Sequence, residues 1–170
     1  MSDADATPNV IEDSEPTAVV PEGASATPSD AAADPVFRVM NVESVTFDLG
    51  DPSPQVHLME GEAPYRHLSV PIALPEAQAL HAAMHNLTGR RPSTHELASA
   101  IIRQFAADII AVRVTHYDAG VFYAELDVMT PRGREVFDAR PSDAFILALR
   151  QAVSAPILCD EQVLAQFYVS

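Results

Sequence analysis

The chain has 170 residues, enough for one globular domain and a tail; 48% are hydrophobic and 20% are charged. The longest apolar run is six residues, Ala144–Leu149, far short of the roughly 20 that a membrane-spanning helix needs. The acidic amino terminus lacks the apolar centre of a secretory signal, and the lone Cys159 has no internal disulfide partner. We therefore expect a cytoplasmic protein with no membrane partner.

The net charge of −14 comes from 24 acidic residues and 10 arginines, with no lysine. Residues 1–34 hold eight acidic residues and no basic one, and they are rich in Ala, Pro, Ser and Thr. Such a segment cannot bury enough surface to offset its ordering entropy. We predict a disordered acidic tail over 1–34 and a folded domain over 35–170. Because this domain still carries −6, contacts with nucleic acid require a local arginine cluster.

In the first half of the domain, alternating apolar residues predict one or two strands over 36–47 and two more over 55–60 and 65–74. A helix is predicted from Pro75, with an end at Gly89. A second helix is predicted from about Ser93. Its apolar face is formed by Leu97, Ile101, Ile102 and Phe105.

The second half continues with three predicted strands, at 107–117, 120–129 and 134–140. A helix is predicted from Pro141 to about Val153, and because it is apolar nearly all round it should be buried. A short strand over 155–160 and a helical turn or two over 161–167 complete the pattern.

The two halves resemble each other when the first is shifted by 66 positions. Val70, Ala73 and Pro75 then coincide with Val136, Ala139 and Pro141. We interpret this as a duplicated unit of three strands followed by a helix. The predicted fold class is α+β, with the duplicated strands in one curved or barrel-like mixed sheet and the helices packed against it.

Two polar segments, 90–96 and 138–144, each coincide with the start of a predicted helix. Helix amino termini bind anions through free N–H groups, arginine binds phosphate, and histidine transfers protons near neutral pH. Carboxylates hold Mg²⁺ or Mn²⁺. The candidate catalytic residues are His95, Glu96, Ser142 and Asp143; the phosphate ligands are Arg91, Thr94 and Arg140; the metal ligands are Glu96, Asp138 and Asp143.

The same residues have a purely structural interpretation. Ser93 with Glu96 three positions later is a capping box, and Ser142 before Asp143 has the pattern of a helix N-cap. Arg140 has acidic residues nearby with which it can pair. On this interpretation the segments only start helices.

At these segments the chain resembles the bifunctional nuclease family, over roughly residues 36–165. The resemblance rests on the motifs Val70-Pro71-Ile72, Glu76-Ala77, Arg91–Glu96, Val121–Ala124, Asp138–Ala144 and Ala155-Pro156-Ile157. It implies an α+β fold with a duplicated strand-and-helix unit, assembly into homodimers or larger homo-oligomers, and action on DNA and RNA as described for some plant relatives.

Residues and resemblance together favour a nuclease that hydrolyses phosphodiester bonds in RNA, DNA or both, assisted by Mg²⁺ or Mn²⁺. Two alternatives stay open. One is a non-catalytic dimeric binding or regulatory module, which the net acidity favours. The other is a pocket for a small anionic ligand, which needs the same arginines and N–H groups but no metal.

Overall fold

The computed structural model describes residues 34–47 and 53–167. The strands are β1 (Phe37–Thr46), β2 (Gln55–Glu60), β3 (His67–Pro71), β4 (Asp108–Asp118), β5 (Val121–Thr130), β6 (Gly133–Ala139) and β7 (Ile157–Asp160). The helices are α1 (Leu74–Met84), α2 (Thr94–Gln104), α3 (Pro141–Leu149) and α4 (Glu161–Phe167). The predicted tail lies outside the described residues apart from Asp34.

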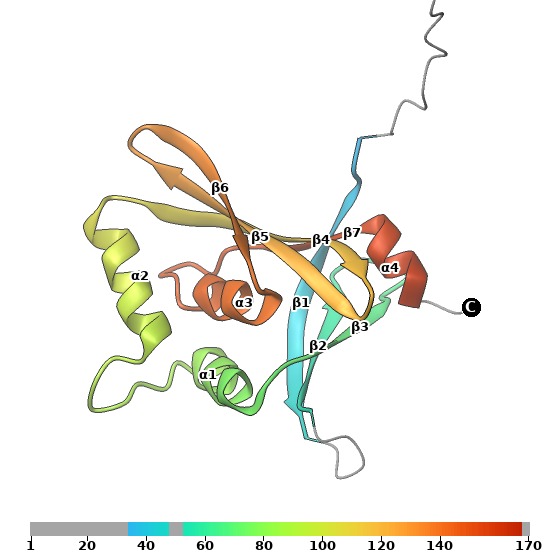
Figure 1. Cartoon of the computed structure of the whole chain (residues 1–170), viewed down its shortest axis with the longest axis horizontal. Helices are drawn as coiled ribbons and strands as arrows, with labels where there is room; N and C mark the ends of the chain where they lie inside the picture. The colour runs from blue at the N-terminus through green and yellow to red at the C-terminus, as the bar shows by residue number, and fades with distance from the viewer. Residues whose placement is uncertain (1–33, 48–52, 168–170) are drawn as a thin grey trace, which may run out of the picture. The chain divides into compact units, whose positions relative to one another are not determined.

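The strands form one mixed sheet in the order β3-β2-β1-β7-β4-β5-β6 (Figure 1). β1–β2–β3 and β4–β5–β6 are two antiparallel meanders, and each leads into a helix, α1 or α3. β7 joins the meanders, since it pairs antiparallel with β1 and parallel with β4. The predicted α+β fold with a duplicated unit is confirmed. In the described part of the chain β3 and β6 are the sheet edges, so the sheet is open and not a closed barrel.

Helix α3 lies at the centre of the helical layer, packed against β4, β5, α1 and α2 (Figure 1). Its continuous apolar sequence explains this place, because a helix without a polar face is stable only when it is covered on all sides. Phe145 and Ile146 are fully buried, as predicted for this helix. The central position brings the amino terminus of α3 next to α1 and α2.

Two helices are shorter than predicted. α1 ends at Met84 and not at Gly89, because Asn86 adopts a left-handed conformation (φ 51°). The amide of Leu87 then donates to the carbonyl of Ala82, which is the hydrogen bond of a Schellman motif. α3 ends at Leu149 and not near Val153. After α3 the chain turns back, and the amide of Ala155 donates to the carbonyl of Ala148.

The predicted apolar face of α2 is only partly used for packing. Ile102 packs against the core, but Leu97, Ile101 and Phe105 are 53%, 48% and 73% exposed. None of the described helices is long and apolar enough to cross a membrane.

Candidate functional site

The amino terminus of α2 is fixed by a capping box, as the sequence predicts. The Ser93 hydroxyl accepts from the amide of Glu96, and the Ser93 amide donates to Glu96 Oε2 at 2.7 Å. Hydrogen bonds from Ser93 hold the pKa of Glu96 below its usual value. The other carboxylate oxygen, Oε1, lies 3.4 Å from Arg150 Nη1. These contacts hold the first turn of α2 in one conformation, which directs His95 toward α3.

The amino terminus of α3 follows β6 directly. Arg140 is the N-cap residue, with extended backbone angles, and Pro141 is the first helical residue. Proline suits this position because its missing N–H would have no helical acceptor there. The predicted N-cap role of Ser142 is therefore wrong; this residue lies within the first turn and is only 6% exposed. Asp143 lies in the same turn and is partly exposed.

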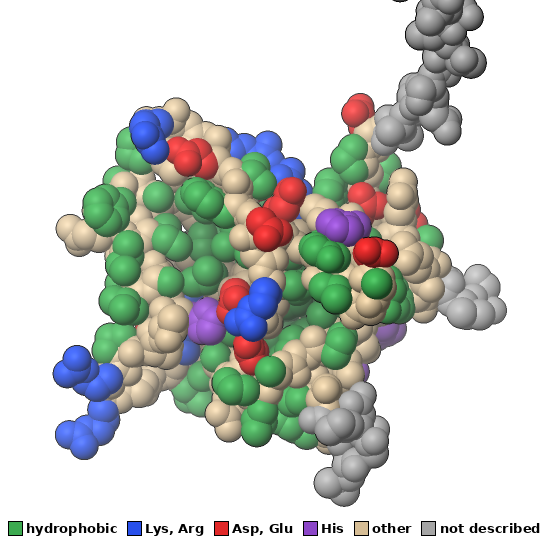
Figure 2. Space-filling view, viewed as in Figure 1, with side chains coloured by type: hydrophobic (Ala, Val, Ile, Leu, Met, Phe, Trp, Pro, Cys, Tyr) green, Lys and Arg blue, Asp and Glu red, His purple; other side chains and the backbone are tan. Residues whose placement is uncertain are grey.

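Side chains from three helix starts meet in one line of contacts. His95 Nε2 lies 3.0 Å from Asp143 Oδ1. Arg140 donates to both oxygens of Asp143, with Nε 2.8 Å from Oδ2 and Nη2 3.2 Å from Oδ1. Arg140 Nη1 lies 2.9 Å from Oε1 of Glu76, in the first turn of α1. Figure 2 shows histidine, acidic and arginine side chains gathered at the middle of this face.

The contacts determine which atoms are available for chemistry. Burial by itself raises the pKa of Asp143, but hydrogen bonds from Arg140 and His95 outweigh it, so this pKa lies below its usual value. An ionised carboxylate only accepts hydrogen bonds, so the Nε2 atom of His95 must carry the proton. In the neutral ring, Nδ1 is then the free base. The carboxylate of Asp143 also raises the pKa of Arg140, which stays a cation.

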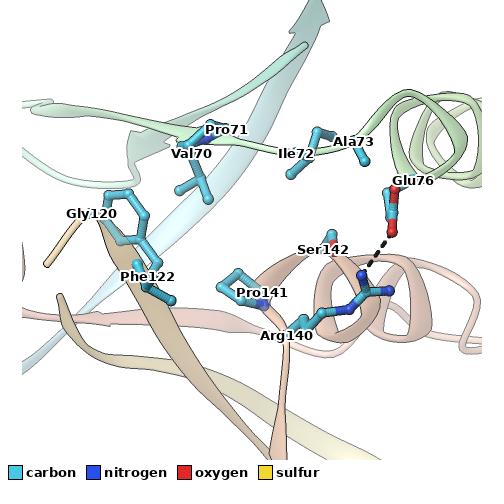
Figure 3. A pocket seen from close by; sticks show the side chains of 11 residues that line it. Val70, Pro71, Ile72, Ala73, Glu76, Gly120, Phe122, Arg140, Pro141 and Ser142 are labelled. Atoms are coloured by element: carbon cyan, nitrogen blue, oxygen red, sulfur yellow. Dashed lines mark ion pairs between the residues drawn. The ribbon is translucent and has the colours of Figure 1, made fainter. Parts of the chain in front are cut away.

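Two cavities adjoin the Glu76–Arg140 pair, and both residues line each of them. The first, of about 230 Å³, lies between the end of β3, the start of β5 and the start of α3 (Figure 3). The buried Ser142 lines it, and Figure 3 shows Arg140 reaching toward Glu76 at one side. The second cavity, of about 250 Å³, is also lined by Thr94 and His95. A bound anion in either cavity would therefore meet the guanidinium of Arg140.

The other predicted site residues lie apart from this line of contacts. Arg91 is exposed in the α1–α2 connection. Asp138 is exposed and faces Glu125 across the β5–β6 ladder, whereas its neighbour Ala139 faces Ala124. Because successive strand residues point to opposite faces, Asp138 and Ala139 lie on different faces of the sheet.

Glu76 is the site residue that the sequence reasoning missed. A signal was present in the repeat, because the 66-residue shift that aligns Pro75 with Pro141 also aligns Glu76 with Ser142. The start of α1 is thus the duplicate of the start of α3. The two helices pack against each other, which brings both starts to the same place.

Comparison with known proteins shows the family of the chain. The profile of the bifunctional nuclease domain matches residues 56–170, a range that includes all the site residues named above. The chain belongs to the bifunctional nuclease domain family. Two Mycobacterium tuberculosis proteins, named uncharacterized protein Rv1829 and uncharacterized protein MT1877, are each 37% identical to it over 101 residues. These matches cover 59% of this chain and 58% of each relative.

Among the described residues, few side chains that can bind a metal ion lie close together. Within residues 34–47 and 53–167, no three His, Cys, Asp or Glu side chains are placed to share a metal ion. Glu96, Asp138 and Asp143 are thus not gathered into one cluster. At this site Glu76 and Asp143 each pair with Arg140.

Proposed function

We propose that this member of the bifunctional nuclease domain family hydrolyses phosphodiester bonds in RNA, DNA or both. The observation that carries the proposal is the His95–Asp143–Arg140 line of contacts, which joins a proton-transfer group to a phosphate-binding cation beside two cavities. Histidine oriented by a carboxylate is a common general base, and arginine binds phosphate through paired N–H groups.

In the proposed mechanism, His95 Nδ1 takes the proton from the attacking hydroxyl or water as its oxygen bonds to phosphorus. The bond between phosphorus and the leaving oxygen breaks, and that oxygen takes a proton from the imidazolium of His95 or from water. Asp143 is a positioning residue, since it holds Nε2 protonated and stabilises the imidazolium that forms. Arg140, whose side chain is 65% exposed, neutralises the phosphate. The hydroxyl groups of Thr94 and Ser142 line the two cavities and are proposed to orient phosphate oxygens. Arg91 is proposed to contact a neighbouring phosphate of a longer strand.

We propose that a divalent cation, Mg²⁺ or Mn²⁺, is held by Glu76 and Asp143. Mg²⁺ is usually bound by one or two carboxylates with substrate phosphate and water completing its shell, and both carboxylates would become available to it when Arg140 turns to the phosphate. The ion would supply positive charge next to the phosphate. This is useful at a site where two carboxylates outnumber the single arginine.

The alternative of a non-catalytic module is favoured by one observation. The same four side chains tie the starts of α1, α2 and α3 together, so the contacts also have a structural role. The two roles differ in their consequences: a structural network loses stability when it is broken, whereas a catalytic one loses cleavage in variants that remain folded.

We also propose that the protein self-associates through α2. The support is the exposed apolar stripe of Leu97, Ile101 and Phe105, which no other described element covers. Sedimentation should give twice the 18.3 kDa chain mass for the wild type and the single-chain mass for Ile101→Asp. Val153→Asp is the matched control, since Val153 is apolar and 85% exposed but lies outside α2. A cytoplasmic location stays a prediction, consistent with the single buried Cys159.

The test of the proposed activity is cleavage of labelled single-stranded RNA and DNA by purified protein, with Mg²⁺, with Mn²⁺ and with EDTA. The proposal predicts cleavage that Arg140→Gln reduces strongly and Arg132→Gln, on the far β5–β6 turn, leaves unchanged. Absence of cleavage under all three conditions would contradict the nuclease activity. Equal cleavage by folded Arg140→Gln would contradict the assigned site.

A further inference from the structure

The two cavities that share Arg140 differ in their lining. The cavity of about 230 Å³ lies between the end of β3, the β4–β5 turn and the start of α3 (Figure 3). Apart from Glu76, Arg140 and Ser142, its lining side chains are apolar, and they include Pro71, Ala73, Val121 and Phe122. His95 lines the neighbouring cavity and not this one. We call the cavity of about 230 Å³ the apolar cavity.

The apolar cavity presents accessible side chains to a ligand. Pro71 and Ala73 are exposed, and Val121 is 51% exposed. The side chain of Arg140 is 65% exposed. A ligand that enters from solvent can therefore contact both apolar side chains and a guanidinium.

The volume of the cavity restricts what it can hold. Pockets for drug-sized ligands usually measure roughly 300–1,000 Å³. The apolar cavity, of about 230 Å³, therefore suits one ring system and not a whole nucleotide. A flat ring with apolar faces matches this lining, because its faces can contact apolar side chains while its point of attachment lies toward the polar ones.

Arg140 joins the apolar cavity to the proposed reaction centre. Its guanidinium pairs with Glu76 and Asp143 and lines both cavities. A phosphate bound by Arg140 would thus adjoin the cavity that His95 lines and also the apolar one. In a nucleotide the phosphate and the base are attached to the same sugar. Since the sugar is polar and the base has apolar faces, the base is the part of a bound strand that fits the apolar cavity.

We infer that the apolar cavity binds one nucleobase of the substrate strand and that the substrate is single-stranded nucleic acid, an inference that rests on the proposed nuclease function. A base in a duplex is paired and stacked, so it must be extruded before it can enter a cavity. An unpaired base does not bear this cost. The geometry therefore selects single strands over duplexes without contacts that recognise a particular sequence.

The first test does not depend on cleavage. It is an NMR titration of the ¹⁵N-labelled full chain in Mg²⁺ with adenosine 5′-monophosphate (AMP), and with ribose 5-phosphate as the same molecule without the base. Both should shift the amides of residues 140–144, but only AMP should also shift those of 70–73 and 120–122. AMP should bind at least about tenfold more tightly, because its base removes apolar surface from water. Equal binding of the two molecules overturns the inference.

Filling the cavity provides the matched variant. Ala73 is exposed and precedes the first turn of α1 with φ −81° and ψ 160°, a conformation that leucine also adopts, so Ala73→Leu should fold. It should weaken AMP binding about tenfold and leave ribose 5-phosphate binding unchanged. Ala165→Leu, at an exposed alanine of α4, is the control and should bind both molecules as the wild type does. Unchanged AMP binding by Ala73→Leu overturns the inference.

The second test separates the inference from the proposed function. One labelled strand is offered to the wild type alone and in a blunt duplex, and the single strand should be cleaved at least about tenfold faster. Equal cleavage of the duplex overturns the inference while the nuclease function stands. If neither form is cleaved but AMP still gives its base-dependent shifts, the nuclease function fails and the base-binding cavity stands.

Discussion

Replacing Asp143 by asparagine tests the role of the carboxylate that joins His95 to Arg140. Asparagine keeps the shape but loses the charge, and its NH₂ group can donate to His95 Nε2. The imidazole is then free to carry its proton on Nδ1, which removes the proposed base. Loss of general base catalysis lowers cleavage by a factor of about 10²–10⁴.

The same change costs only part of the fold's stability. Asp143 is 30% exposed and loses charge-assisted hydrogen bonds to two partners, but Arg140 is 65% exposed, so water screens that pair. We expect a loss of about 1–2 kcal/mol in the free energy of unfolding. At 25 °C such a variant remains folded if the domain has the usual stability of about 5–15 kcal/mol.

The assay measures kcat/KM on a labelled RNA oligonucleotide together with urea unfolding of the same preparation. Asp108→Asn is the matched control, because Asp108 is exposed at the start of β4, outside the site. Asp143→Asn with wild-type kcat/KM and a native fold would refute the reasoning. Loss of folding at 25 °C would also refute it, because the contacts would then be chiefly structural.

Three further predictions concern the fold. The buried Glu60 is paired with Arg66 at 3.0 Å, and its second cation, Arg38, lies 3.8 Å away and is 45% exposed. Arg66→Met therefore leaves the buried carboxylate with only this weaker partner and should cost about 3 kcal/mol in urea unfolding; an unchanged midpoint would contradict this. Hydrogen bonds from Arg66 and Arg38 lower the pKa of Glu161 from 4.5 to about 2. Its contribution to stability is therefore complete above about pH 4.5 and is lost as the pH falls toward 2. In Glu161→Gln the melting temperature should depend less on pH between about 4.5 and 2 than it does in the wild type. Burial raises the pKa of Cys159 to about 12. A thiol reagent should therefore label it only when the protein unfolds. Rapid labelling of the native protein would contradict its burial.

The sequence was sufficient to predict the features that depend on local pattern. The capping box at Ser93 follows from two residues three positions apart, and the burial of α3 follows from its unbroken apolar run. The duplicated unit follows from matched positions such as Pro75 and Pro141. The first two features involve neighbours in the chain and the third is a repeat within the sequence, so none of them depends on which elements pack together.

Other features depend on packing between distant elements. Arg140 has an acidic residue on each side in sequence, Asp138 and Asp143. It pairs with Asp143 because both lie at the first turn of α3, whereas Asp138 belongs to β6 and faces Glu125 across the ladder. The contact with Glu76 requires α1 to lie against α3, which no local pattern specifies. The helical spacing of Leu97, Ile101 and Phe105 is visible in the sequence. Their exposure is not, because it depends on which other elements pack against α2.

Chemical rescue of His95→Ala tests the central claim most directly, because it asks whether an imidazole at this position transfers the proton. The variant removes the ring and leaves space beside Asp143, so added imidazole can take its place. The account predicts strongly reduced RNA or DNA cleavage by folded His95→Ala and a saturable recovery with imidazole that Asp143→Asn does not show. Cleavage by His95→Ala equal to the wild type, or a loss that imidazole does not restore in the folded variant, would contradict it.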